Sequence, residues 1–172
     1  MNNGAESLNA PLWRPARQGR RCVVDVQSVV FGEGVTLENY VEIQQHVVVH
    51  AGAVIRSYTR VGHHCTIGAR CVIKCAAIMG PYTVLKADVF VGPQTVFLSD
   101  LGSNLTNTLV GSGAFIGAGC MVMPGVTIGA NAFVAAGTRV NRDCESGKAY
   151  GGVPMRELSK SGPEMKRRVF GG

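Results

Sequence analysis

The chain has 172 residues, six cysteines and a formal net charge of +6, and only 6% of its residues are aromatic. This length predicts one domain with a sizeable core. The sequence lacks a run of about 18 apolar residues, and residues 1–11 lack the basic and apolar regions of a signal peptide, so we expect neither a membrane span nor secretion. The positive charge suits acidic partners, such as phosphorylated small molecules or nucleic acid, unless it serves only solubility.

The N-terminal residues carry little pattern. We expect residues 1–18 to form an N-terminal extension. Asp25 stands where the later repeat has an apolar residue, so residues 13–30 are predicted to form an irregular cap or an incomplete coil.

From Phe31 onward an apolar residue recurs at every sixth position. A period of six fits neither an amphipathic helix nor simple strand alternation. It is typical of a hexapeptide β-helix, in which each hexad forms one short strand and one corner. The repeated positions are Phe31, Leu37, Ile43, Val49, Ile55, Val61, Ile67, Ile73, Met79, Leu85, Val91 and Phe97, then, after a slip of seven residues, Val110, Ile116, Val122, Ile128, Val134 and Val140.

Three hexads make one triangular coil, so residues 18 apart should stack. The repeat predicts about six coils between residues 19 and 145, interrupted by a loop at 98–109. Four cysteines fall at a second inward position that otherwise holds small residues, and we interpret them as core residues in a reducing cytosol. These are Cys65, Cys71, Cys120 and Cys144. Glycines such as Gly62 and Gly80 directly follow repeated positions, where we expect them to supply backbone dihedrals that other residues adopt at a cost.

The last segment, 146–172, is charged and contains a proline, so we expect it to leave the coil and to end in a short helix near 164–169. The cysteines and histidines do not have the spacing of a zinc site, and no metal is expected.

Two stretches of the sequence are similar to a known family. The repeats over residues 20–158 resemble the left-handed β-helix acyltransferases. Residues 88–140 look like bacterial acetyltransferases that N-acetylate amino groups on nucleotide-linked 3-amino sugars. Gly-Gly-Val-Pro-Met-Arg at 151–156 resembles the segment that closes their acetyl-CoA site, with Met155 in place of the usual alanine.

The resemblance implies an all-β, left-handed parallel β-helix and a cytoplasmic homotrimer with sites at its three subunit interfaces. It implies acetyl-CoA as the donor and an amino sugar on a nucleotide as the acceptor, for surface polysaccharide synthesis. Nucleic acid and membrane are not expected partners. Residues 61–74 also look like the β-helical pointed-end subunits of dynactin, so a non-catalytic scaffold is the alternative function. The γ-type carbonic anhydrases share this fold and bind a metal through histidines. Their paired histidines fall where this chain has Ala69 and Lys74, so that activity is not expected.

The loop 98–109 is predicted to hold the acceptor. It contains no histidine, lysine or arginine, and all four histidines lie upstream of it. A neutral amine needs less help from a base than a hydroxyl does, so this favours N-acylation. Asp100 is the candidate to orient or deprotonate the amine, or else a turn residue, and Ser99 is the candidate to bond the acceptor. The further predicted substrate contacts are Gln94, Asn104 and Asn107.

The donor is expected to lie in a groove between adjacent prisms, where small residues allow close approach. The same small residues are also what any corner of the coil requires. The candidates for the pantetheine arm are Ala118, Gly119, Ala136, Gly137 and Thr138, and those for the CoA phosphates are Arg139, Lys148 and Arg156.

Overall fold

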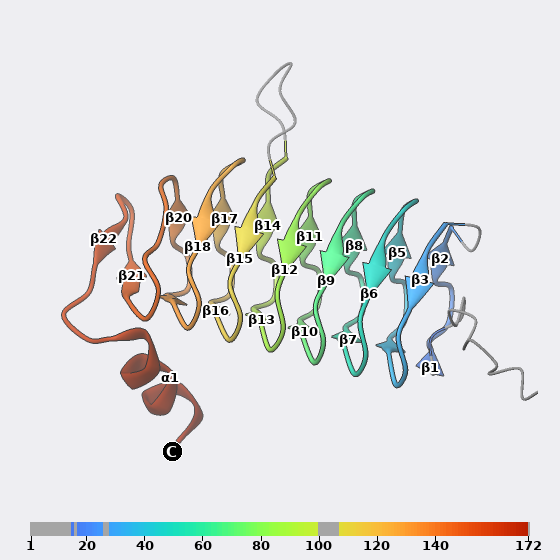
Figure 1. Ribbon diagram of the computed structural model, residues 1–172, viewed down its shortest axis with the longest axis horizontal. Helices are drawn as coiled ribbons and strands as arrows, with labels where there is room; N and C mark the ends of the chain where they lie inside the picture. The colour runs from blue at the N-terminus through green and yellow to red at the C-terminus, as the bar shows by residue number, and fades with distance from the viewer. Residues whose placement is uncertain (1–14, 16, 26–27, 100–106, 172) are drawn as a thin grey trace, which may run out of the picture.

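The computed structural model describes residues 15, 17–25, 28–99 and 107–171. They form a three-sided prism of short parallel strands, with one helix at the C-terminal end (Figure 1). This confirms the predicted parallel β-helix. The seven strands on one side correspond to about seven turns rather than six.

Each side of the prism is one sheet, named here by its number of strands. The nine-stranded sheet contains β1 (Arg17–Gln18), β4 (Thr36–Leu37), β7 (Val54–Ile55), β10 (Val72–Ile73), β13 (Phe90–Val91), β16 (Phe115–Ile116), β19 (Phe133–Val134), β21 (Ala149–Gly151) and β22 (Arg156–Glu157). The seven-stranded sheet contains β2 (Val23–Val24), β5 (Glu42–Ile43), β8 (Arg60–Val61), β11 (Ile78–Met79), β14 (Val96–Phe97), β17 (Met121–Val122) and β20 (Arg139–Val140). The six-stranded sheet contains β3 (Val30–Phe31), β6 (Val48–Val49), β9 (Thr66–Ile67), β12 (Val84–Leu85), β15 (Leu109–Val110) and β18 (Thr127–Ile128).

The strand register follows the 18-residue coil. Ile73 pairs with Val91 on the next coil, whereas Leu85 pairs with Val110, seven residues later than the repeat requires. The extra residues therefore lie at the corner between β14 and β15. All the repeated apolar positions from Phe31 to Val140 are buried in one continuous core.

The four predicted core cysteines are buried and unpaired, which confirms their role as core residues. Burial raises the pKa of the Cys65 thiol to about 11. Such a thiol stays protonated and unreactive near neutral pH.

The backbone of the first coil is more regular than the fading sequence pattern suggests. Strands β1 and β2 pair in register with β4 and β5. At the inward positions, however, Gln18 is exposed and Val24 is only half-buried. The paired strands of this turn are thus regular in backbone but bury little, because few of their inward side chains are apolar.

The glycines that follow the repeated positions have a different purpose from the one expected. Gly62 and Gly80 do not have a positive φ. A Cβ on Gly80 would lie 2.5 Å from the carbonyl oxygen of Phe97, and one on Gly62 would lie 2.7 Å from the nitrogen of Pro81. These positions need glycine because the next coil passes too close for a side chain, and the expectation about dihedrals was wrong.

The left-handed φ values occur instead at the corners of the prism, which we name after the sheets they join. The nine-to-seven corner holds residues 57–58, 93–94, 118–119 and 136–137, and the seven-to-six corner holds 45–46, 63–64 and 81–82. Non-glycine residues accept this conformation, as Tyr58 does with φ 63° and His64 with φ 57°. The corners therefore accept many kinds of side chain, because the pairing of the strands does not depend on them.

The C-terminal segment turns back along the prism (Figure 1). After the antiparallel pair β21–β22, helix α1 (Gly162–Phe170) begins at Ser161, whose side chain and Glu164 form a capping box. The helix lies on β19 of the nine-stranded sheet, and its Phe170 ring meets the stacked rings of Phe90 and Phe115 edge-on. The expected terminal helix is confirmed. With nine residues, it is also too short to cross a bilayer, and the described ranges offer no other candidate span.

Candidate functional site

The seven-to-six corner carries a ladder of rings that ends where the loop begins. The ring centroids of His46 and His64 are 4.8 Å apart, and those of His64 and Tyr82 are 5.0 Å apart. The next rung is the start of the loop, because Ser99 occupies the position 18 residues after Pro81 and 36 after His63. Histidine and loop therefore share one corner, with His63 about 10 Å from Ser99 at about 4.8 Å per coil.

The two adjacent histidines are held as a pair. The Nδ1 atoms of His63 and His64 lie 2.9 Å apart, so one ring donates and the other accepts. The backbone N–H of His63 donates to Oε1 of Gln44 at 3.1 Å. Stacking removes His64 partly from water, and together with the nearby His46 and His63 this lowers its pKa. Imidazole rings at this corner are candidates to take part in proton transfer.

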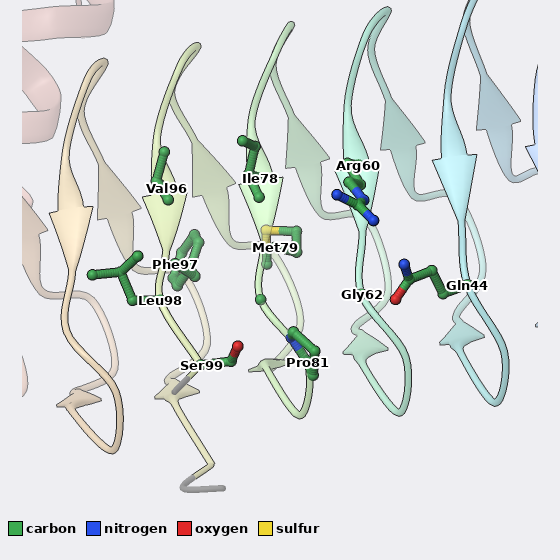
Figure 2. Close-up of a pocket in the computed structure, with 11 residues that line it drawn as sticks. Gln44, Arg60, Gly62, Ile78, Met79, Pro81, Val96, Phe97, Leu98 and Ser99 are labelled. Carbon is green, nitrogen blue, oxygen red and sulfur yellow. The ribbon is translucent and has the colours of Figure 1, made fainter. Parts of the chain in front are cut away.

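A hollow of about 330 Å³ lies beside this corner on the seven-stranded sheet. Figure 2 shows Arg60, Ile78 and Val96 in a row on neighbouring strands, with Gln44 and Ser99 toward opposite ends of the hollow. Ile78 is 43% exposed, so the floor of the hollow offers apolar surface. Arg60 forms an exposed ion pair with Glu42 on the neighbouring strand β5, with Nε 3.2 Å from Oε1.

The predicted acceptor residues are distributed over two corners. Ser99 lines the hollow, and Asn107 is exposed where the loop returns to β15. Asp100 and Asn104 lie outside the described residues. Gln94 lies at the nine-to-seven corner, one coil before Gly119, because the backbone N–H of Gly119 donates to the carbonyl of Pro93.

Most of the predicted donor residues lie along the nine-to-seven corner. Ala118, Gly119, Ala136 and Gly137 are exposed, and a Cβ on either glycine would meet nothing within 4 Å. This stretch of the corner is bare, which leaves its backbone open to an extended ligand. The hydroxyl of Thr138 is buried and donates to the carbonyl of Ala135, so it is not available to a ligand.

The three predicted cations differ in their surroundings. Arg139 lines a hollow of about 300 Å³ together with residues of the proline-containing segment, Asn141, Val153, Pro154 and Met155. Lys148 lies past residues 146–147, at the corner between the six- and nine-stranded sheets, and its Nζ contacts Oε1 of Glu157 at 2.7 Å, which raises its pKa. Arg156 is exposed on β22. Arg139 is thus the cation that the structure places beside the bare corner.

The sequence pattern had not pointed to His63 and His64 as neighbours of the loop. They precede it by more than 30 residues. The signal was nevertheless present, because counting by 18 from Ser99 leads to Pro81 and then to His63. Nowhere in the described ranges do three or more histidine, cysteine or acidic side chains gather as a metal site would require.

Comparison with known proteins confirms the resemblance to hexapeptide-repeat acyltransferases. The family model "Bacterial transferase hexapeptide (six repeats)" matches residues 107–142, and "Hexapeptide repeat of succinyl-transferase" matches residues 58–92. A putative acetyltransferase of Bacillus subtilis, YvoF, is 43% identical over 61 residues, which is 36% of this chain and 35% of that protein.

Solved structures match over a longer part of the chain. A perosamine N-acetyltransferase from Caulobacter crescentus, a variant with asparagine in place of a histidine, was solved with CoA and GDP-perosamine. It is 29% identical, with a TM-score of 0.53 over 81% of this chain and 54% of that chain. The acetyltransferase domain of PglB from Neisseria gonorrhoeae, in complex with acetyl coenzyme A, is 24% identical, with a TM-score of 0.52 over 76% of this chain and 57% of that one, and it supports the fold alone. The chain thus spans little more than half the length of these structures, and about a third of the Bacillus relative.

Proposed function

We propose that the protein is an acetyl-CoA-dependent N-acetyltransferase whose acceptor is an amino sugar on a nucleotide carrier, used in surface polysaccharide synthesis. The observation that carries the proposal is the similarity of the chain to an N-acetyltransferase solved with CoA and GDP-perosamine. The paired His63 and His64, two coils from the start of the loop, offer a candidate base. The bare corner at Gly119 and Gly137 supports a donor site, and the similarity to a protein solved with CoA and GDP-perosamine supports both substrates.

The reaction proposed is direct acyl transfer. The lone pair of the acceptor amine attacks the carbonyl carbon of the thioester, and a C–N bond forms. The carbon–sulfur bond then breaks, and CoA leaves as a thiolate. The amine loses one proton to a base, and that proton neutralises the thiolate. Backbone N–H groups at the site would stabilise the oxyanion of the tetrahedral intermediate.

His63 is the base that we assign to this step. Its ring is half-buried, and its Nδ1 shares a hydrogen bond with Nδ1 of His64, which holds the ring in place. An imidazole is the side chain most often used to take a proton in such a step. Ser99, at the rim of the hollow, would bond the acceptor. The role of Asp100 in orienting the amine stays a prediction.

The active form that we propose is a cytoplasmic homotrimer. The bare nine-to-seven corner is convex, and a ligand lying along it would be enclosed only by a second prism. Sites between subunits would provide that enclosure. Sedimentation analysis should give a trimer, and a monomer at micromolar concentration would contradict sites of this kind.

The test is release of the CoA thiol from acetyl-CoA in the presence of amino sugars linked to UDP, GDP or dTDP. We expect thiol release with at least one of them, together with an acetylated product. The matched control is the same nucleotide sugar with a hydroxyl group in place of the amine. Transfer only to the hydroxyl compound would contradict N-acylation, and a folded protein that neither binds acetyl-CoA nor releases thiol would point to the scaffold alternative.

A further inference from the structure

Five of the seven outward-facing residues of the seven-stranded sheet form a row that runs from one arginine to another, and Glu42 and Val23 continue this row beyond Arg60. In strand order they are Arg60, Ile78, Val96, Met121 and Arg139, each the direct partner of the next. Four strand steps of about 4.8 Å place the two arginines roughly 19 Å apart. Between them lie apolar side chains, of which Ile78 is 43% and Met121 42% exposed.

Arg139 lies beside the bare corner and the proline-containing segment, where the donor is proposed to bind. Arg60 lies at the other end and lines the hollow that reaches Ser99. Acetyl-CoA and a nucleotide sugar are both anionic at the end away from their reacting group. A row that runs from one arginine to another suits two such substrates that meet between them.

The geometry of Arg60 suits a phosphate ligand. Its Nε lies 3.2 Å from Oε1 of Glu42, in an exposed ion pair without a hydrogen bond, and its terminal guanidinium nitrogens make no hydrogen bond to the residues that the structure describes. The N–H donors of the guanidinium fork are therefore available to a ligand. A planar fork of N–H donors matches the oxygens of a phosphate.

The spacing fits the acceptor as well. Arg60 lies two strand steps from Val96, or about 10 Å, and Ser99 follows three residues later at the corner. A sugar ring between a diphosphate and an amine spans a distance of this order. Figure 2 shows Ile78 between Arg60 and Val96, and these two apolar side chains would carry the less polar face of the ring.

We propose that this hollow is the acceptor subsite, in which Arg60 binds the diphosphate of the nucleotide sugar and directs the sugar toward the seven-to-six corner, which carries His63 and Ser99. The inference rests on the proposed function and deepens it. It assigns the preference for a nucleotide-linked acceptor to one side chain, because a free amino sugar offers Arg60 no anion.

The experiment titrates the full-length protein with UDP, GDP, dTDP and inorganic pyrophosphate, and separately with acetyl-CoA. We expect Arg60→Gln to weaken binding of the preferred nucleoside diphosphate by about tenfold or more, the typical effect of losing a hydrogen bond to a charged group. Binding of acetyl-CoA should not change. Arg17→Gln, an exposed arginine of β1 on another sheet, is the matched control and should change neither.

A second variant separates anion binding from the ion pair. Glu42→Gln removes the pair but keeps the cation, so diphosphate binding should be retained or become tighter. If Glu42→Gln weakened binding as much as Arg60→Gln, the role of Arg60 would be structural and the proposal would be wrong. Unchanged binding in Arg60→Gln, or no binding of any of the four probes by the wild type, would also overturn it. In both cases intact acetyl-CoA binding and turnover would leave the proposed function standing.

Discussion

The two corners that flank the seven-stranded sheet have the same backbone and opposite surfaces. The seven-to-six corner is filled with rings, from His46 through His64 to Tyr82. The nine-to-seven corner begins with the stacked rings of Tyr40 and Tyr58 but becomes bare at Gly119 and Gly137. The repeat fixes the path of the chain and leaves the corner side chains free, so chemistry can differ from corner to corner at little cost to the fold.

This difference suggests a division of labour. In the function that we propose, the filled corner would supply groups that move protons and bond the acceptor, and the bare corner would supply open backbone for an extended donor.

The largest effect is expected from His63→Ala at the filled corner. Loss of a general base typically lowers turnover by about 100-fold to 10,000-fold. Affinity for acetyl-CoA should not change, because the donor lies at the other corner. His46→Asn is the control, since it stands on the same ladder but further from the loop, and Asn tolerates its φ of 56°. An equal loss in both variants would mean that the ladder acts only structurally.

The next effect comes from filling the bare corner. Gly119→Tyr combined with Gly137→Tyr would continue the ladder of Tyr40 and Tyr58, which hold the same left-handed backbone. Each change should cost about 1–2 kcal/mol of stability, because a side chain at positive φ is strained. Affinity for acetyl-CoA, measured by calorimetry, should fall by about tenfold or more.

Ala76→Tyr is the matched control for the bare corner. It adds the same ring at the same corner, two coils earlier, where φ is 58°. Acetyl-CoA affinity should stay near that of the wild type. If Ala76→Tyr weakened binding as much as the double variant, the donor site would extend along the whole corner.

A smaller effect is expected from the cations near the donor. Arg139→Gln should weaken acetyl-CoA binding by roughly tenfold, because a charge-assisted contact to a phosphate is lost. Lys148→Gln should change it little, since Lys148 already pairs with Glu157 and exposed pairs of this kind contribute at most about 1 kcal/mol. If Lys148→Gln weakened binding more than Arg139→Gln did, the site of the CoA phosphates would have to be assigned to the corner between the six- and nine-stranded sheets.

The smallest effect concerns pH. The pKa of His64 is lowered from the ordinary value of 6.5, so the unfolded chain binds this proton more readily than the folded one. The stabilising contribution is therefore complete above about pH 6.5 and is lost as the pH falls through the lowered value. Thermal unfolding of His64→Asn should lose less stability between pH 7 and 5 than the wild type does. Equal losses would show that His64 does not contribute to the acid sensitivity.

The sequence allowed the interior of the prism to be predicted almost residue by residue. Burial forces an apolar side chain at each repeated position, so Ile55 and Val91 could be placed on stacked coils from spacing alone. The role of Gly80 was misjudged because, in the sequence, a glycine required by close packing of two coils looks the same as a glycine required by a special backbone dihedral.

The candidate site was less predictable, because corner positions accept many residue types. His63 and Ser99 are 36 residues apart in the sequence, although the coil places both at the seven-to-six corner. Conversely, Gln94 seemed to belong with the loop that follows it but lies at the other corner. Arg60 had no signal of its own, since an arginine on a strand is ordinarily a solvated side chain and only the hollow beside it suggests a ligand.

The most direct test of this account is a calorimetric titration of the wild-type protein and the Gly119→Tyr, Gly137→Tyr double variant with acetyl-CoA. We predict saturable binding near one site per subunit in the wild type and a large loss of affinity in the variant. A folded wild-type protein that does not bind acetyl-CoA, or a variant that binds it equally well, would contradict the assignment of the bare corner to the donor.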